Sequence, residues 1–260
     1  QRFFELARPY LESLVGNELA MQLRINLSIQ LPQDDSSLLP IHSDTWSGDS
    51  PFEVVVWVPL VDCYGTKIGS EEVFVSDDPT IPESMGFYLF DDEGVESRKR
   101  ELIKGGVITD LLHNRETSFK MNIRSNAASR SVEFDKEPII RMSNTFIEPG
   151  DYDITELLSD IKKGVYIKNF MEWNIDDRRE NQRYVGFEAY LIKNGELDIN
   201  VKSPVLELTS KKFWSSVDAR SKNLDFKAAN CGKGEPMQGA PVWTGAPDVR
   251  LRNIRIGNRS

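Results

Sequence analysis

Residues 181–197 read NQRYVGFEAYLIKNGEL, and this stretch indicates the fold class of the larger part of the chain. Its centre, from Val185 to Ile192, is rich in β-branched and aromatic residues and is followed by Asn194-Gly195. An Asn-Gly pair after a strand is a strong signal for a tight β-hairpin, because both residues accept positive φ angles. The stretch therefore predicts a strand, a tight turn and a returning strand.

Other segments have the same strand and turn chemistry. Residues 101–103 and 107–112 flank the turn sequence Lys104-Gly105-Gly106. Residues 73–76 and 86–90 are shorter apolar segments bounded by residues typical of turns. We therefore expect a mainly β protein of the α+β class with antiparallel or mixed sheets.

One helix is predicted with defined ends. Asp153 is a suitable N-cap, and Glu156, three positions further on, completes a capping box. Gly164 is a candidate C-cap, because glycine accepts the left-handed conformation that often ends a helix. The side chains expected to face the core are Leu157, Leu158 and Ile161.

A second helix is predicted over residues 210–219. We interpret Trp173, Trp214 and Trp243 as core or subunit contacts rather than as a binding site for a cofactor. The polar run from Asn181 to Tyr184 has two interpretations, a substrate groove or the edge of a strand.

Composition and charge limit the partners. The 260 residues have a formal net charge of -9 and no basic stripe, which argues against nucleic acid, whose phosphates require clustered Lys and Arg. The longest apolar runs are far shorter than the roughly 20 residues of a membrane span. Two cysteines, Cys63 and Cys231, are too few for a secreted disulfide framework. We expect a cytoplasmic protein that binds neither nucleic acid nor a membrane.

A change in pattern predicts two units. Residues 3–23 have the apolar spacing of a short helix, and two apolar strands follow it. Near residues 65–70 the apolar strand gives way to Gly, Thr, Lys and acidic residues, so we place a border between residues 1–68 and 69–260. Because the chain begins with Gln1 rather than Met, we expect it to be part of a longer gene product.

His42 and Asp44 form the first candidate metal site. They lie two residues apart, so on an extended segment both side chains point to the same side and can bind one metal ion. A His-x-Asp pair with a distant His is the facial triad of non-haem Fe(II) oxygenases. By itself the pair is a weak motif, and an exposed loop is the alternative interpretation.

The surroundings of this pair carry a resemblance. Residues 39–67 read LPIHSDTWSGDSPFEVVVWVPLVDCYGTK, and residues 23–67 as a block resemble the cupin-like 2-oxoglutarate and Fe(II) oxygenases of sporadic carbohydrate biosynthesis clusters. The resemblance implies a partial double-stranded β-helix, with His42 and Asp44 as Fe(II) ligands. A third ligand and a 2-oxoglutarate anchor would be His113 and Arg124. His113, however, lies in the segment LLHNRETS, which by resemblance belongs to a second family.

Six blocks of sequence beyond residue 70 carry this second resemblance. In chain order they are SDDPTIP (76–82), FDDEGVESRKRELIKGGVITDLLHNRETS (90–118), RMSNTFIEPGD (141–151), DIKKGVYIKNF (160–170), NQRYVGFEAYLIKNGEL (181–197) and NCGKGEPMQGAPVWTGAPDVRLRNIRIG (230–257). Together they resemble the TldD/PmbA metallopeptidases, once called modulators of DNA gyrase, in their TldD-like branch. The resemblance implies that residues 69–257 form the β-rich C-terminal domain of that family.

The resemblance also implies a zinc site that this chain contains only in part. In the family, two histidines of a His-Glu-x-x-x-His helix and one cysteine of a Cys-Gly loop hold zinc, and the Glu is the general base. Cys231 occupies the cysteine position, and Gly232 and Gly234 would allow close backbone approach. A buried small residue is the alternative interpretation of Cys231. No His-Glu-x-x-x-His segment occurs in this sequence, which indicates a gene fusion or a truncation.

Three functional hypotheses follow. In the first, the chain is the C-terminal domain of a TldD-like zinc metallopeptidase that supplies one zinc ligand and a peptide channel, is inactive alone, and forms a homo- or heterodimer with a TldD/PmbA-type subunit. In the second, it is an oxygenase that binds Fe(II) through His42, Asp44 and His113, and 2-oxoglutarate through Arg124. In the third, it is a non-catalytic assembly module that pairs with a complete subunit.

Overall fold

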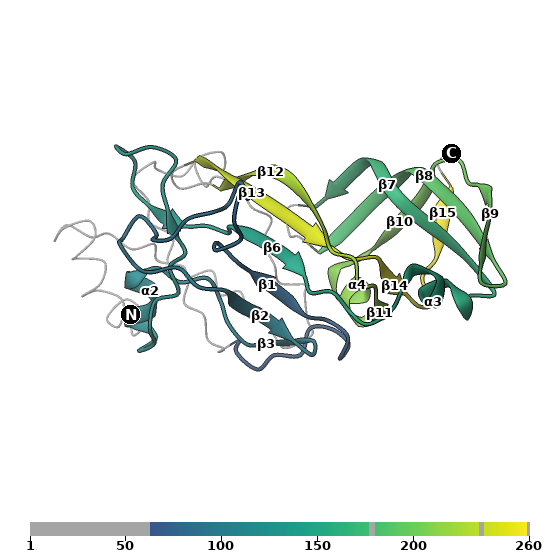
Figure 1. Cartoon of the computed structure of the whole chain (residues 1–260), viewed down its shortest axis with the longest axis horizontal. Coiled ribbons are helices and arrows are strands. Elements are labelled where there is room, and N and C mark those ends of the chain that lie inside the picture. The colour runs from purple at the N-terminus through teal and green to yellow at the C-terminus, as the bar shows by residue number, and fades with distance from the viewer. Residues whose placement is uncertain (1–62, 177–179, 234–236, 259–260) are drawn as a thin grey trace, which may run out of the picture. The chain divides into compact units, whose positions relative to one another are not determined.

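The computed structural model describes residues 63–176, 180–233 and 237–258. All of these belong to the second of two compact units, Ser50–Ser260. His42, Asp44 and the helix predicted over residues 3–23 lie outside the described residues. The described part is mainly β, with two larger sheets, two short ladders and three short helices (Figure 1). This confirms the fold class predicted from the sequence.

The first large sheet has six strands in the order β12-β13-β6-β1-β2-β3. Their bounds are β1 Val75–Asp77, β2 Arg100–Lys104, β3 Val107–Ile108, β6 Asn144–Ile147, β12 Asp225–Lys233 and β13 Gln238–Ala246. Neighbouring strands are antiparallel except β13 and β6, which run parallel, so the sheet is mixed. The β2–β3 hairpin turns at Gly105 and Gly106, as predicted, although its second strand is shorter than residues 107–112.

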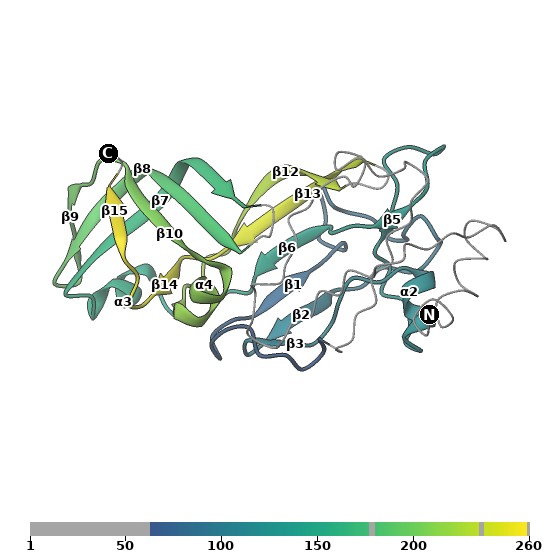
Figure 2. The ribbon, with the colours of Figure 1, turned by 180° about the vertical axis from the view of Figure 1, so that it is seen from behind.

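The second large sheet has the order β15-β10-β8-β7, with β9 also paired to β8 (Figure 2). The bounds are β7 Lys163–Ile175, β8 Asn181–Lys193, β9 Glu196–Asn200, β10 Pro204–Thr209 and β15 Ile256–Asn258. The turn between β8 and β9 has φ angles of 51° at Asn194 and 86° at Gly195, which confirms the hairpin predicted from residues 181–197. A Cβ on Gly195 would lie 2.8 Å from the carbonyl oxygen of Ser159, so glycine is required there.

The helices are α2 Arg115–Lys120, α3 Ile154–Ser159 and α4 Ser210–Ser216. In α3, Asp153 is the N-cap and its backbone N–H donates to Glu156 Oε2 at 2.7 Å, as predicted. The helix ends at Asp160, so the C-cap predicted at Gly164 is wrong: Gly164 lies in β7 and pairs with Ile192. None of the described helices has the length and apolar character needed to cross a membrane.

Of two further predictions about local structure, the helix after residue 210 is confirmed except for its end, and the strand over residues 86–90 is wrong. The predicted helix over residues 210–219 ends early, because buried Val217 begins β11 (Val217–Arg220) and pairs with β14 (Val249–Leu251). The predicted strand over residues 86–90 is an irregular segment with one isolated bridge, at Phe90. Its central residue, Tyr88, points inward and donates its hydroxyl to the carbonyl of Ala127 at 2.8 Å.

An apolar cluster of Val73, Val75 and Val217 brings the six-stranded sheet and the β11–β14 ladder together. Trp214 packs against this cluster, as expected of a core residue. Trp173 is instead 58% exposed. The remaining strands are β4, Ser129–Arg130, and β5, Ile139–Ile140, which pair with each other.

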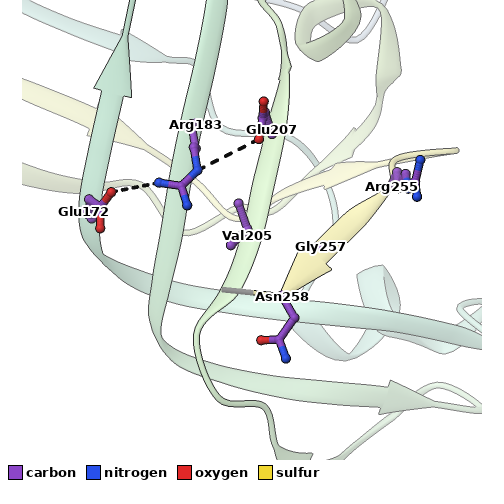
Figure 3. A pocket seen from close by; sticks show the side chains of 7 residues that line it. All are labelled: Glu172, Arg183, Val205, Glu207, Arg255, Gly257 and Asn258. Atoms are coloured by element: carbon purple, nitrogen blue, oxygen red, sulfur yellow. Dashed lines mark hydrogen bonds and ion pairs between the residues drawn. The ribbon is translucent and has the colours of Figure 1, made fainter. Parts of the chain in front are cut away.

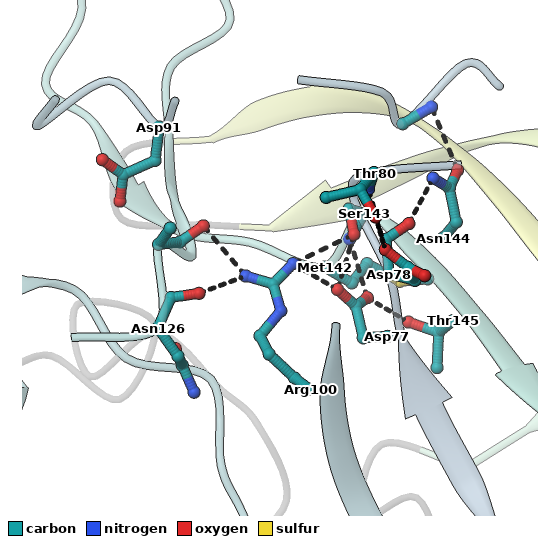
Figure 4. Close-up of polar contacts among 12 residues, drawn as sticks. Asp77, Asp78, Thr80, Asp91, Arg100, Asn126, Met142, Ser143, Asn144 and Thr145 are labelled. Atoms are coloured by element: carbon teal, nitrogen blue, oxygen red, sulfur yellow. Dashed lines mark hydrogen bonds and ion pairs between the residues drawn. The ribbon is translucent and has the colours of Figure 1, made fainter. Parts of the chain in front are cut away.

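A buried ion pair holds the centre of the six-stranded sheet. The side chains of Arg100 and Asp77 are both fully buried and in direct contact, and Asp77 also accepts hydrogen bonds from Ser143 and Thr145 (Figure 4). Burial acts to lower the pKa of Arg100, but Asp77 and Tyr88 together outweigh it and raise that pKa above its ordinary value. Arg100 therefore stays charged, its contact with Asp77 joins β2 to β1, and the hydrogen bonds that Asp77 accepts from Ser143 and Thr145 reach the start of β6.

Candidate functional site

Cys231 lies on β12, the edge strand of the six-stranded sheet, directly opposite Ala240 of β13. The expected Cys-Gly loop is therefore wrong at this position, because Cys231 and Gly232 both belong to a regular strand. A Cβ on Gly232 would meet no atom within 4 Å, so close backbone approach does not explain this glycine. Gly234 lies outside the described residues.

A buried arginine fixes the backbone on both strands of this hairpin. Arg141 is 2% exposed, and its Nη2 donates to the carbonyl oxygen of Cys231. Its Nη1 donates to the carbonyl oxygen of Gln238 at 2.8 Å. Since each nitrogen reaches a different strand, one planar guanidinium holds β12 and β13 together near Cys231.

Residues 130–142 provide further contacts to the same hairpin. Lys233 Nζ donates to the carbonyl of Ile140 at 2.8 Å, and Arg130 Nη2 donates to the carbonyl of Pro241 at 3.0 Å. The amide of Gln238 accepts from the backbone N–H of Val132 at 3.1 Å. Burial, followed by repulsion from neighbouring Arg141, lowers the pKa of Lys233. The strand that carries Cys231 is thus held by defined contacts to an adjoining segment.

The thiol itself is left largely uncommitted by these contacts. Cys231 is half-buried, and its Sγ makes one long contact, 3.9 Å, to the carbonyl oxygen of Gly232. A thiolate in this position can act as one soft ligand for zinc. In the described ranges, however, no three His, Cys, Asp or Glu side chains form a group that could hold a metal ion. The described residues therefore do not fit a zinc ion by themselves.

His113 lies in a different environment from that expected of an open iron ligand. It is 3% exposed, its Nε2 is 2.8 Å from the hydroxyl of Tyr64, and its Nδ1 is 3.1 Å from Oγ1 of Thr117. Burial lowers the pKa of His113, and Asp110 partly opposes this effect. Both ring nitrogens thus have partners within the domain. Arg124, the candidate 2-oxoglutarate anchor, is exposed.

The polar run from Asn181 to Tyr184 belongs to β8 itself rather than preceding the strand. It is paired on one side with β7 and on the other with β10, so it does not form a sheet edge. Arg183 lines an open depression of about 640 Å³ (Figure 3). Its other lining residues are Glu172, Val205, Glu207, Arg255, Gly257 and Asn258. Sequence reasoning missed these residues, because the register that brings them to one place comes from four separate strands.

Comparison with known proteins identifies the family. Residues 47–258 match the model of the PmbA/TldA metallopeptidase C-terminal domain. The chain therefore belongs to the TldD/PmbA family of metallopeptidases and contains its C-terminal domain. The match begins at residue 47 and so includes part of the segment that resembles an oxygenase, a resemblance that gains no support from this family model. The border predicted between residues 68 and 69 stays a prediction.

Two relatives of the chain are longer proteins. It is 39% identical to a metalloprotease of Methanocaldococcus jannaschii over 73% of this chain and 41% of the relative. It is 26% identical to a zinc metalloprotease TldD homolog of Saccharolobus solfataricus over 74% of this chain and 43% of the relative. The chain thus spans about two-fifths of the length of these relatives.

Two solved structures have the same fold. One is TldE from Thermococcus kodakarensis, with a TM-score of 0.61, 20% identity, and coverage of 77% of this chain and 43% of that one. The other is a putative modulator of DNA gyrase from Thermotoga maritima, with a TM-score of 0.59, 20% identity, and coverage of 76% and 42%. This confirms the β-rich fold that the six sequence blocks imply for residues 69–257.

Proposed function

We propose that this chain is the C-terminal part of a TldD-like zinc metallopeptidase, that Cys231 is one zinc ligand, and that the chain alone is inactive. The observation that carries the proposal is the combination of a fixed backbone and an uncommitted thiol at Cys231. Family membership supports a metallopeptidase, and one relative is named as a zinc enzyme. Two imidazole ligands and a general base must come from outside the described residues.

The second part of the proposal concerns the partner. The chain spans about two-fifths of the length of its relatives, and in this proposal the other zinc ligands come from another part of the same gene product or from a second TldD/PmbA-type subunit. The proposed complex is a cytoplasmic homo- or heterodimer that hydrolyses peptides. The alternative, a non-catalytic assembly module, would pair in the same way without contributing a ligand.

Complementation tests the proposal. The chain is mixed with a polypeptide that carries the His-Glu-x-x-x-His helix of a relative, and peptide hydrolysis is measured in the presence of zinc. We expect activity only in the mixture, loss of activity with Cys231→Ala, and no change with Cys63→Ser, the matched control at the other cysteine. Full activity of the Cys231→Ala mixture would leave the assembly module as the better description.

The oxygenase hypothesis requires a separate test. It depends on His42 and Asp44, which lie outside the described residues, and on His113, whose ring nitrogens contact Tyr64 and Thr117. Incubation with Fe(II) and 2-oxoglutarate should release succinate, and His42→Ala should abolish that release, if this activity exists. Absence of turnover in the parent chain would remove the hypothesis.

A further inference from the structure

The depression on the five-stranded sheet is lined by a row of alternating charges. Glu172 on β7, Arg183 on β8 and Glu207 on β10 follow one another across three neighbouring strands (Figure 3). On the other side of β10, Arg255 lines the same depression and directly precedes β15, whose first residue, Ile256, pairs with Leu206. The row therefore reads acidic, basic, acidic, basic across the sheet.

The inner members of this row are already committed to each other. Arg183 Nη1 is 2.8 Å from Glu172 Oε1, and these side chains are 36% and 33% exposed. Arg183 Nε also faces Glu207 Oε2 at the longer distance of 3.9 Å. Arg183 thus shares its charge between two carboxylates and has little capacity left for a ligand.

The outer members have spare capacity. Glu207 is 72% exposed, and its contact to Arg183 is close to the limit of an ion pair. Arg255 is exposed, and within the described ranges no hydrogen bond or ion pair joins its side chain to another residue; no dashed line reaches it in Figure 3. One acidic and one basic group therefore face the same depression without pairing with each other.

Two of the other residues that line the depression, Val205 and Gly257, carry no polar side chain. Val205 is 6% exposed, and Gly257, its register partner, adds no side chain. The depression has a volume of about 640 Å³, which lies within the usual range for small-ligand sites. A ligand that fits needs an ammonium group for Glu207, a carboxylate for Arg255 and an apolar body between them.

We propose that this depression binds a small zwitterion, a short peptide with free amino and carboxyl ends. The chemical class rests on the proposed peptidase function, because short peptides with free ends are what such an enzyme releases. Glu207 accepts from the ammonium group, Arg255 donates to the carboxylate, and Arg183 holds Glu207 in place through its second contact. Binding requires no metal and no hydrolysis.

Titration of the full chain with alanyl-valine, followed by NMR, tests the proposal. We expect weak saturable binding, on the order of millimolar affinity, that shifts amide signals of β10 and β15. N-acetylation or C-amidation of the peptide should each weaken binding about fivefold, the upper range for an exposed ion pair. A parent chain that does not bind, or binds all three peptides equally, overturns the proposal.

Two variants assign the ends of the peptide. Glu207→Gln should weaken binding of the free peptide but not of the N-acetyl peptide. Arg255→Gln should weaken binding of the free peptide but not of the C-amidated peptide. Matched controls are Glu101→Gln and Arg115→Gln, exposed residues outside the depression, which should change nothing. Equal losses for all peptides in both variants would contradict the assigned orientation and the proposal. Because no metal is used, this result is independent of the complementation experiment.

Discussion

The two large sheets use the same pairing of arginine with carboxylate in opposite environments. In the six-stranded sheet, Arg100 and Asp77 are fully buried, and surrounding hydroxyl and carbonyl groups form further hydrogen bonds with them. In the five-stranded sheet, Arg183 and Glu172 are about one-third exposed and line an open depression. The first pair has solvent excluded from it, and the second has room for a ligand beside it.

The difference in burial separates charged side chains that stabilise the fold from charged side chains that a ligand can reach. A buried pair cannot lose one partner without leaving an uncompensated charge in a medium of low dielectric constant. An exposed pair is screened by water and salt, so its loss matters little for folding. The region around Cys231 combines both features, since buried Arg141 holds the backbone while the thiol remains accessible.

The largest expected effect is in the buried pair. Asp77→Asn leaves the Arg100 charge without its counterion and should lower the free energy of unfolding by about 3–5 kcal/mol. Urea denaturation followed by circular dichroism measures the change. A loss below about 1 kcal/mol, the value for surface pairs, would show that the two sheets do not differ as described.

The next effect is at the hairpin that carries Cys231. Arg141→Met removes the donors to the carbonyls of Cys231 and Gln238 and should cost about 1–3 kcal/mol. In a Cys63→Ser background Cys231 is the single thiol, so its alkylation rate by iodoacetamide reports the exposure of Sγ. We expect faster alkylation in Arg141→Met. We expect no change in Lys227→Met, which lies earlier on the same strand.

A smaller effect depends on pH. Burial lowers the pKa of His113 in the folded state. Between this lowered pKa and the value of about 6.5 for an unfolded histidine, the unfolded chain binds more protons than the folded chain. Stability contributed by neutral His113 is therefore present above pH 6.5 and is lost as pH falls from there through the lowered folded pKa. The difference in unfolding free energy between the parent and His113→Gln should decrease on acidification. If this difference in unfolding free energy instead grows on acidification, the result contradicts a buried neutral imidazole at His113.

The smallest effect on stability is in the exposed row. Arg183→Met should change the free energy of unfolding by about 0–1 kcal/mol, and by less in high salt. The same variant should weaken alanyl-valine binding, because it removes the second contact to Glu207. A stability loss as large as that of Asp77→Asn would remove the contrast between the two sheets.

The parts of the fold that local chemistry specifies were predictable. Asn194-Gly195 requires positive φ angles, and Asp153 with Glu156 forms a capping box, so the hairpin and the start of α3 follow from neighbouring residues. Gly164 was misassigned because its pairing with Ile192 depends on a strand many residues away.

The candidate site also combines features that the sequence predicts with features that depend on residues far apart in the chain. Cys231 was selected from the family resemblance, yet nothing local in the sequence points to Arg141, which is 90 residues away. Glu207 and Arg255 line the same depression because β10 pairs with β15, which single residues do not reveal. A loop was expected around Cys231 because the family resemblance implies one, and the pairing of this segment with β13 decides that it is a strand.

Zinc content measured on purified protein tests the central claim most directly. The chain alone should hold well below one zinc per molecule after dialysis, because among the described residues no three His, Cys, Asp or Glu side chains form a group that could hold a metal ion. With the complementing polypeptide, the account predicts one zinc per complex, lost in Cys231→Ala and retained in Cys63→Ser. One tightly held zinc in the chain alone, or an unchanged zinc content of the complex with Cys231→Ala, would contradict it.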